Sequence, residues 1–139
     1  MLRVVLDPGV LIAAVISASG APAELLDRWR DGEFDLVVSP NLLNELEDVL
    51  LRPKFAARAS DDEVRAYVEA LAAGGLAFDD PVEPPAVTSD PGDDYLVALA
   101  VAARADAIVS GDRHLTELAD PPVPVITPRE LVERFERPA

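Results

Sequence analysis

The sequence contains no cysteine, a single lysine and a single histidine. The absence of cysteine excludes disulfides, zinc sites built on thiolates and cysteine nucleophiles. Basic side chains are also scarce: 12 lysine and arginine residues are outnumbered by 26 aspartate and glutamate residues, for a net charge of −14. Phosphate binding depends on counterion release by lysine and arginine, so this imbalance opposes long-range attraction to nucleic acid. A divalent cation or a basic partner would be needed to offset it locally.

The sequence also lacks an apolar run long enough to form a transmembrane helix. The first apolar stretch begins at residue 3, which leaves no room for a signal peptide. We therefore expect a cytoplasmic protein without membrane contact. Half of the 139 residues are hydrophobic, which argues against disorder, and the length fits one domain, residues 1–139, with a proper core.

The most informative stretch runs from Asp90 to Ala103. It begins Asp90-Pro91-Gly92-Asp93-Asp94 and continues into a helical segment that is apolar on nearly every side, which is typical of a buried helix. Carboxylates at the start of a buried helix are costly unless they are paired. They serve either as ordinary caps, with Asp90 as N-cap, or as ligands of a cation. Both interpretations stay open at this point.

Apolar runs alternate with helical patterns along the chain. This alternation predicts an α/β fold, a three-layer sandwich with a central parallel sheet of four to five strands. Ligands of such sheets bind beyond the carboxyl ends of the strands. The expected strands are 3–7, 34–38, 107–110 and 123–126, with a short edge strand near 76–78, and the expected helices are 10–16, 22–30, 41–51, 63–73, 91–104, 113–118 and 128–135.

Several acids fall at the expected carboxyl edge of the sheet. Asp7 ends the first strand, Asp112 follows the strand 107–110, and Asp94 opens the helix that precedes that strand. Each also has a structural explanation, since Asp7 and Asp112 each precede a helix that they could cap. Glu45 and Glu47 border the apolar face of the helix 41–51 on opposite sides, and the helical period does not choose between them.

Four motifs together resemble the PIN-domain nucleases, in particular the VapC-like toxins of toxin–antitoxin pairs. They are Val4-Val5-Leu6-Asp7, Ser39-Pro40-Asn41-Leu42-Leu43-Asn44-Glu45, Asp90-Pro91-Gly92-Asp93-Asp94 and Ile108-Val109-Ser110-Gly111-Asp112. The resemblance implies a PIN-like domain whose catalytic and metal-binding acids are Asp7, Glu45, Asp94 and Asp112, which favours Glu45 over Glu47. It implies an endoribonuclease that cuts RNA with Mg²⁺ or Mn²⁺, an antitoxin protein as partner and a toxin role.

This residue set suits phosphodiester hydrolysis. Hard cations such as Mg²⁺ and Mn²⁺ take carboxylate and water oxygens as ligands, activate water and stabilise charge on oxygen. Five further residues are candidates for supporting the acids or touching substrate: Asp93, Ser110, Arg113, Arg52 and Lys54. Arg113 would contact either a phosphate or a carboxylate. The only histidine, His114, is expected at the surface or packed rather than acting as a general base.

The chain departs from the family pattern after the first acid. The family usually carries Thr or Ser and then Asn there, and this sequence has Pro8 and Gly9. An Asn amide would steady the acidic cluster, so its loss and the net charge of −14 favour an alternative, a PIN-fold binding module that acts through protein partners. Apolar residues of the first two helices, including Trp29, predict association with an antitoxin or as a homodimer.

Two other α/β families fit the sequence poorly. A response-regulator receiver needs a lysine after its last strand, and the only lysine, Lys54, lies elsewhere. A haloacid-dehalogenase phosphatase needs a second aspartate two residues after the first, where this chain has Gly9.

Overall fold

A computed structural model of the protein describes residues 1–82 and 91–137. Five strands form one parallel sheet in the order β3-β2-β1-β4-β5, which confirms the α/β fold expected from the sequence. Asp90, the expected N-cap of the apolar helix, lies outside the described residues. The strands are β1 (Arg3–Leu6), β2 (Asp35–Val38), β3 (Leu76–Ala77), β4 (Ala107–Val109) and β5 (Val125–Ile126).

The central strands are buried on both faces. In the register of the sheet, Val4 of β1 lies between Leu36 of β2 and Ala107 of β4, and all three side chains are buried. Strands covered on both faces have no polar face to expose, so they read as continuous apolar runs. This explains why the strands could be found in the sequence although each is only two to four residues long.

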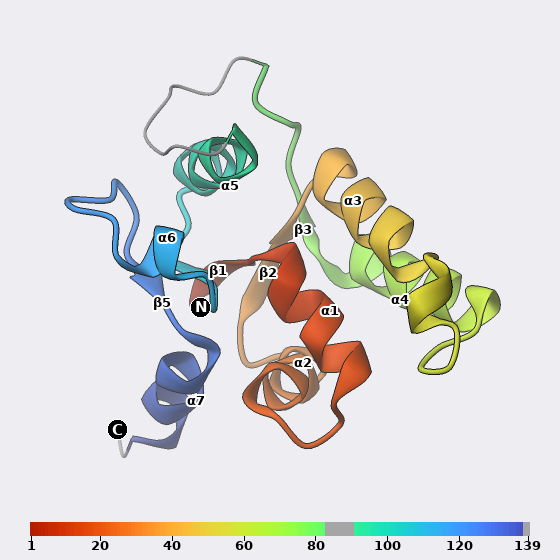
Figure 1. The fold of residues 1–139 in the computed structure, drawn as a ribbon. Coiled ribbons are helices and arrows are strands. Elements are labelled where there is room, and N and C mark those ends of the chain that lie inside the picture. Colours follow the sequence, from red (N-terminus) through yellow and green to blue (C-terminus); the bar gives the residue numbers. More distant parts are fainter. Residues whose placement is uncertain (83–90, 138–139) are drawn as a thin grey trace.

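Within the described ranges, 1–82 and 91–137, seven helices and one 3₁₀ turn accompany the strands (Figure 1). Their limits agree with the expected ones to within three residues, and the 3₁₀ turn was not expected. The helices are α1 (Pro8–Ile16), α2 (Ala21–Arg30), α3 (Pro40–Leu50), α4 (Asp61–Gly74), α5 (Pro91–Ala102), α6 (Arg113–Thr116) and α7 (Pro128–Glu136), and the 3₁₀ turn is Pro53–Phe55.

Hydroxyl side chains fix the start of three helices. Ser39 accepts a hydrogen bond from the backbone N–H of Leu42 at the start of α3. Ser60 and Thr127 each form a reciprocal capping box with a glutamate three residues later. These caps satisfy backbone N–H groups that have no partner within the helix.

The helices lie in layers on both sides of the sheet. Helix α5 packs on β1 and β4, while α1 packs against β1, α2 and α3. Figure 1 shows α5 on one side of the sheet and α1 and α2 on the other. The core is continuous through these layers, and its largest fully buried side chains include Leu6, Leu11, Leu25, Phe34, Leu99 and Ile108.

Helix α5 differs from the expectation in two respects. It is not buried on every side, because Val101 in its last turn is 49% exposed. As an outer layer, α5 turns one side of this last turn away from the sheet. The helix also ends at Ala102 rather than Arg104, since Arg104 adopts a left-handed backbone conformation with φ of 53°, which terminates helices.

The C-terminal helix is anchored to the rest of the fold by an aromatic contact. The rings of Phe34 and Phe135 stack with centroids 5.6 Å apart, and the guanidinium of Arg28 lies 5.5 Å from the Phe135 ring. Arg28 also pairs with Glu33 at 3.0 Å. Helix α7 therefore packs against α2 at the opposite end of the chain.

Within the part of the chain that the structure describes, no single helix is long and apolar enough to cross a membrane. Helices α1 and α2 meet the length and composition only when taken together, and the pair is bent by 99°.

Gly75 joins α4 to β3 at a point where there is no space for a side chain. A Cβ atom there would lie 2.6 Å from the carbonyl oxygen of Leu71 and 2.7 Å from Cγ2 of Val38. We therefore expect Gly75→Ala to lower the free energy of unfolding by about 1–3 kcal/mol through overpacking. Urea unfolding followed by circular dichroism measures this. Gly111→Ala, whose Cβ would meet no atom within 4 Å, is the control, and an equal loss in both variants would contradict the account.

Candidate active site

The strand order of the sheet changes direction at one point, between β1 and β4. The chain moves from β1 outward to β2 and β3, then returns to add β4 and β5 on the other side of β1. Ligands of open parallel sheets bind at such a point, beyond the carboxyl ends of the two central strands. Asp7 follows β1 directly, and Ser110, Gly111 and Asp112 follow β4.

A buried hydroxyl connects the two strand ends. The Ser110 Oγ–H donates to Asp7 Oδ2 at 2.7 Å. Ser110 Oγ in turn accepts a hydrogen bond from the backbone N–H of Asp112 at 3.0 Å. Ser110 is fully buried. The backbone N–H of Asp7 also donates to the Val109 carbonyl at 2.9 Å. Asp7 and Asp112 are therefore held in a fixed relation, 105 residues apart in sequence.

Each of these two carboxylates also caps a helix, as expected from the sequence. Asp7 Oδ1 accepts from the backbone N–H of Gly9 at 3.0 Å, and Asp112 Oδ1 accepts from the N–H of His114 at 2.9 Å. Capping uses one oxygen of each group, which leaves the second Asp112 oxygen for another role. The structural and functional interpretations of these acids are thus compatible.

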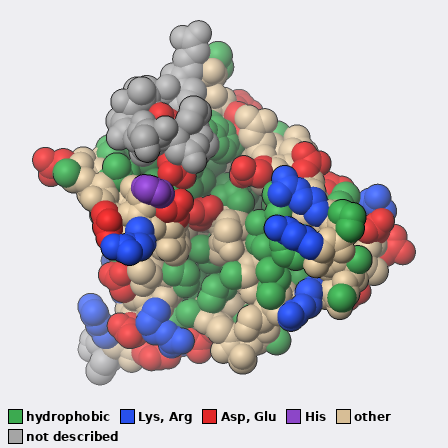
Figure 2. Space-filling model, in the orientation of Figure 1, with side chains coloured by type: hydrophobic (Ala, Val, Ile, Leu, Met, Phe, Trp, Pro, Cys, Tyr) green, Lys and Arg blue, Asp and Glu red, His purple; other side chains and the backbone are tan. Residues whose placement is uncertain are grey.

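A pocket of about 410 Å³ opens between the two carboxylates. Asp7 and Asp112 line it together with Gly9, Gly111 and apolar residues of α1. Asp112 is exposed and Asp7 half-buried, so both are accessible from the pocket. Figure 2 shows acidic side chains gathered in this region, between α6, which carries the only histidine, and α3.

The side-chain atoms at this site are of the type that binds a hard cation. Asp7, Ser110 and Asp112 offer only oxygen, which Mg²⁺ and Mn²⁺ prefer. However, among the residues that the structure describes, no three His, Cys, Asp or Glu side chains lie close enough together to hold a metal ion. The structure thus brings together two carboxylates, and a further ligand would come from elsewhere.

The other two expected acids lie on α3 and α5. Glu45 is exposed and lines a separate pocket of about 430 Å³. Asp94 is 7% exposed in the first turn of α5, beside the half-buried Asp93. The convergence of all four acids on one pocket stays a prediction, as does the choice of Glu45 over the half-buried Glu47.

The basic candidates have different surroundings. The Arg113 Nε–H donates to Glu117 at 3.1 Å, so in this structure Arg113 pairs with a carboxylate of its own helix. The Lys54 ammonium lies 5.1 Å from the ring centre of Phe55. Arg52 lines the same pocket as Glu45. His114 is exposed, in agreement with the surface position expected for it.

One polar network was missed by the sequence interpretation. The Tyr95 hydroxyl on α5 donates to Asp80 Oδ1, and Asp80 Oδ2 accepts from the backbone N–H of Asn41 at 3.0 Å. The Ser39 hydroxyl is a third member of this network and hydrogen-bonds with the Tyr95 hydroxyl. Asp80 thus ties α5 to the start of α3. Nothing in the sequence distinguishes Asp80 from Asp79, which lies beside it.

This network shifts the acidity of its members. Burial and the hydrogen bond to Asp80 raise the pKa of Tyr95 above its usual value. Burial acts to raise the pKa of Asp80, but hydrogen bonds from Ser39, Tyr95 and Asn41 outweigh it and lower the pKa below the usual value. The network is therefore most stable when Asp80 is ionised.

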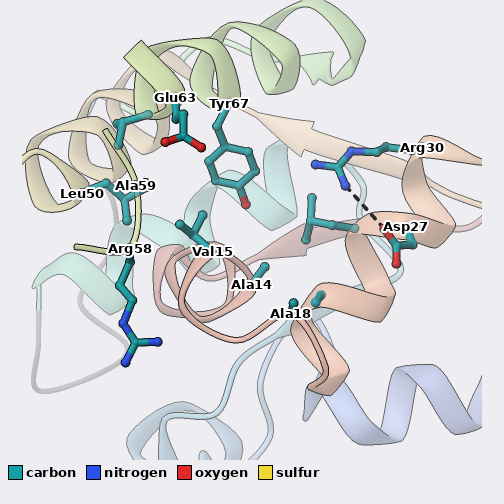
Figure 3. Close-up of a pocket in the computed structure, with 13 residues that line it drawn as sticks. Ala14, Val15, Ala18, Asp27, Arg30, Leu50, Arg58, Ala59, Glu63 and Tyr67 are labelled. Carbon is teal, nitrogen blue, oxygen red and sulfur yellow. Dashed lines mark hydrogen bonds and ion pairs between the residues drawn. The ribbon is translucent and has the colours of Figure 1, made fainter. Parts of the chain in front are cut away.

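A third pocket, of about 450 Å³, lies among α1, α2 and α4 (Figure 3). Its walls include Val15, Leu26 and Val64, and Arg30 and Arg58 extend from two sides of it. Arg30 contacts Asp27 at 3.4 Å. The pocket contains neither of the carboxylates joined by Ser110, so it is separate from the site at the sheet edge.

Removal of the Ser110 hydroxyl tests the connection between the two strand ends. Ser110→Ala leaves the N–H of Asp112 without its acceptor and removes a donor to Asp7, so we expect a loss of about 1–3 kcal/mol of folding free energy. Chemical denaturation measures it. Ser110→Thr keeps the hydroxyl and serves as the control. An unchanged unfolding midpoint in Ser110→Ala would contradict the role of this bond.

Tyr95→Phe tests the Asp80 network and its pH dependence. Because the folded-state pKa of Asp80 is lowered, the network stabilises the fold above the unfolded-state pKa, about 3.9, and loses this effect as the pH falls through the folded value. Near neutral pH the variant should be less stable than wild type by about 1 kcal/mol. The difference should shrink below about pH 4. Urea midpoints across this range measure it, and a difference that grows in acid would contradict it.

Comparisons with known proteins agree with this architecture. Two solved structures share the fold. The structure of PAE2754 from Pyrobaculum aerophilum superposes with a TM-score of 0.66 at 14% identity, covering 97% of this chain and 90% of that one. The structure of VapBC2 from Rickettsia felis bound to a DNA fragment from their promoter gives 0.63 at 10% identity, covering 91% and 98%. Identities this low establish similarity of fold alone.

Sequence comparison extends the result. The chain is 26% identical over 146 aligned positions to the uncharacterized protein MJ1680 of Methanocaldococcus jannaschii, covering 98% of this chain and 93% of that protein. Residues 3–114 match the family model of the PIN domain, a span that includes Asp7, Glu45, Asp94 and Asp112. The chain therefore belongs to the PIN domain family, whose members are generally nucleases.

Proposed function

We propose that the protein is a metal-dependent endoribonuclease that hydrolyses RNA phosphodiester bonds with Mg²⁺ or Mn²⁺. The observation that supports this best is the pair of carboxylates, Asp7 and Asp112, joined through Ser110 at the point where ligands bind to parallel sheets. Membership of the PIN domain family, whose members are generally nucleases, supports hydrolysis of a nucleic acid as the class of reaction.

The proposed roles follow from the contacts of each residue. Asp7 and Asp112 would hold the cation through carboxylate oxygens, while the Ser110 hydroxyl fixes the orientation of Asp7. Glu45 and Asp94 are the further carboxylates proposed for the site. A bound Mg²⁺ or Mn²⁺ supplies an activated water and stabilises charge on the phosphate oxygens.

A bound cation would also offset the negative charge of the protein at the site. With a net charge of −14, the protein repels a phosphodiester backbone unless positive charge is supplied at the site. A divalent ion is the largest local charge in such a site and reverses the sign of the local field. RNA binding should therefore depend on metal, with Arg52 and Lys54 as basic candidates for contact with flanking phosphates.

A toxin role with an antitoxin protein as partner is the finer part of the proposal, and it rests on the family resemblance. The pocket among α1, α2 and α4 supports it, because it offers apolar walls with two arginines beside them. Part of the apolar surface expected for such an interface is instead core, since Leu25 and Leu26 are buried. The half-buried Trp29 and the pocket itself leave a smaller surface for a partner or a second copy.

A binding module without catalysis is the second candidate. Gly9 favours the binding module, because it lies close to the Asp7 carboxylate but has no side chain to support it. The distinction lies in the response to metal and RNA. A panel of structured and single-stranded RNAs, incubated with and without Mn²⁺, separates the two functions directly.

Asp112→Asn distinguishes a metal-binding acid from a capping acid. Asparagine caps helices about as well as aspartate, so a structural role predicts little change in stability. If Asp112 is a metal ligand, its replacement should lower the affinity for Mn²⁺. A metal that binds only the folded protein stabilises it by about 2.7 kcal/mol at a hundredfold excess over Kd. The melting temperature of wild type should rise with Mn²⁺, and that of the variant should rise less, with loss of RNA cleavage.

Asp120→Asn is the matched control for this experiment. Asp120 is exposed and has φ of 50°, which asparagine adopts readily. The Asp120→Asn substitution removes the same charge as Asp112→Asn, and this variant should keep the full response to Mn²⁺ and full cleavage. If Asp112→Asn gains as much from Mn²⁺ as wild type and cleaves as fast, the assignment of Asp112 is wrong. If wild type neither responds to Mn²⁺ nor cuts any RNA, the binding module is the better account.

A further inference from the structure

The pocket beside Glu45 contains an unusual concentration of one side-chain type. The sequence has two asparagines, Asn41 and Asn44, and no glutamine. Both asparagines lie on α3 and line this pocket of about 430 Å³. Every side-chain carboxamide of the protein is therefore found here, next to an acid proposed for the active site.

Three polar side chains of the pocket are exposed to solvent and can contact a ligand. Asn44, Asp48 and Arg52 are exposed. Asp48 and Arg52 lie one helical turn apart, yet within the described part of the chain they form no ion pair with each other. No hydrogen bond of the Asn41 or Asn44 carboxamide is found among the described residues either. The Tyr95 side chain, held by Asp80, forms part of the wall.

The charge of the pocket argues against phosphate as its occupant. Glu45 and Asp48 outnumber Arg52, so a phosphate placed among them would be repelled. Arg52 lies just beyond the C-terminal end of α3, two residues after Leu50, where it can meet a flanking phosphate. The space between Glu45 and Arg52 suits a neutral group that is rich in hydrogen-bonding edges.

We propose that this pocket binds the base of a nucleotide next to the cleaved phosphodiester, and that it selects bases with an amino group over uracil. The inference rests on the proposed ribonuclease function. Single-stranded RNA is read through the edges of unstacked bases. A carboxamide both donates to and accepts from such an edge, whereas Asp48 only accepts. Cytosine, adenine and guanine each present an exocyclic amino group to such an acceptor, whereas the ring N–H of uracil lies between two carbonyl oxygens that a carboxylate repels.

The asparagines also provide the test. In a spectrum of the ¹⁵N-labelled protein, the side-chain carboxamide signals come from Asn41 and Asn44 alone. Titration with cytidine, adenosine and uridine, which carry no phosphate, should move these signals. Cytidine and adenosine should saturate at concentrations about tenfold lower than uridine. The three nucleosides share the ribose, so a difference between them reports on the base.

Asp48→Ala should reduce the preference for cytidine and adenosine without abolishing the movement of the carboxamide signals. Glu69→Ala, which removes an exposed acid of α4, is the control and should leave the preference unchanged. Alanine is used in both variants because it adds no carboxamide. Carboxamide signals that do not move with any nucleoside, or that move equally with all three, would overturn the proposal, as would an unchanged preference in Asp48→Ala.

The titration needs neither metal nor cleavage, so it separates this proposal from the ribonuclease function. Nucleoside binding without RNA cleavage in Mn²⁺ supports the pocket and counts against the nuclease. RNA cleavage with unmoved carboxamide signals counts against the pocket and leaves the nuclease intact.

Discussion

The hydrogen bond from the Ser110 hydroxyl to Asp7 is the interaction on which the proposed site depends. It joins residues that follow the strands β1 and β4, and its donor, Ser110, is fully buried. Each strand end is fixed by the sheet, so the bond sets the relative position of Asp7 and Asp112 without a loop that must be ordered. A site built in this way is preorganised before any ligand arrives.

A second constraint is the excess of negative charge. A chain with a net charge of −14 cannot hold RNA by a basic surface, and its basic residues are partly engaged in local pairs such as Arg113 with Glu117. The two proposed sites meet that constraint by different means. A cation at Asp7 and Asp112 would attract one phosphate, and the pocket of Asn41 and Asn44 would bind a neutral base.

Sequence patterns predicted the fold well because its three central strands, β1, β2 and β4, are buried and its helices begin with recognisable caps. They also predicted that Asp7 and Asp112 meet at one edge of the sheet, which follows from the parallel strand order. The network of Asp80, Tyr95 and Ser39 could not be predicted, since it joins three segments whose packing no local pattern encodes. The exposed side of α5 at Val101 was missed for a similar reason: composition does not tell which side of an apolar helix faces away from the sheet.

The choice between Glu45 and Glu47 shows where a family pattern adds to physical reasoning. Helical periodicity left both at the border of the apolar face, and only the resemblance selected Glu45. In the structure Glu45 is exposed in a pocket and Glu47 is half-buried. The choice of Glu45 over Glu47 therefore stays part of the proposal.

The central claim is that a divalent cation binds between Asp7 and Asp112. Paramagnetic broadening of backbone amide signals by substoichiometric Mn²⁺ tests it most directly, because the effect falls off steeply with distance from the ion. The account predicts selective loss of the signals of Gly9, Gly111 and Asp112, with recovery when excess Mg²⁺ is added. Broadening centred on another acidic part of the surface, or spread evenly over all the exposed acids, would contradict it.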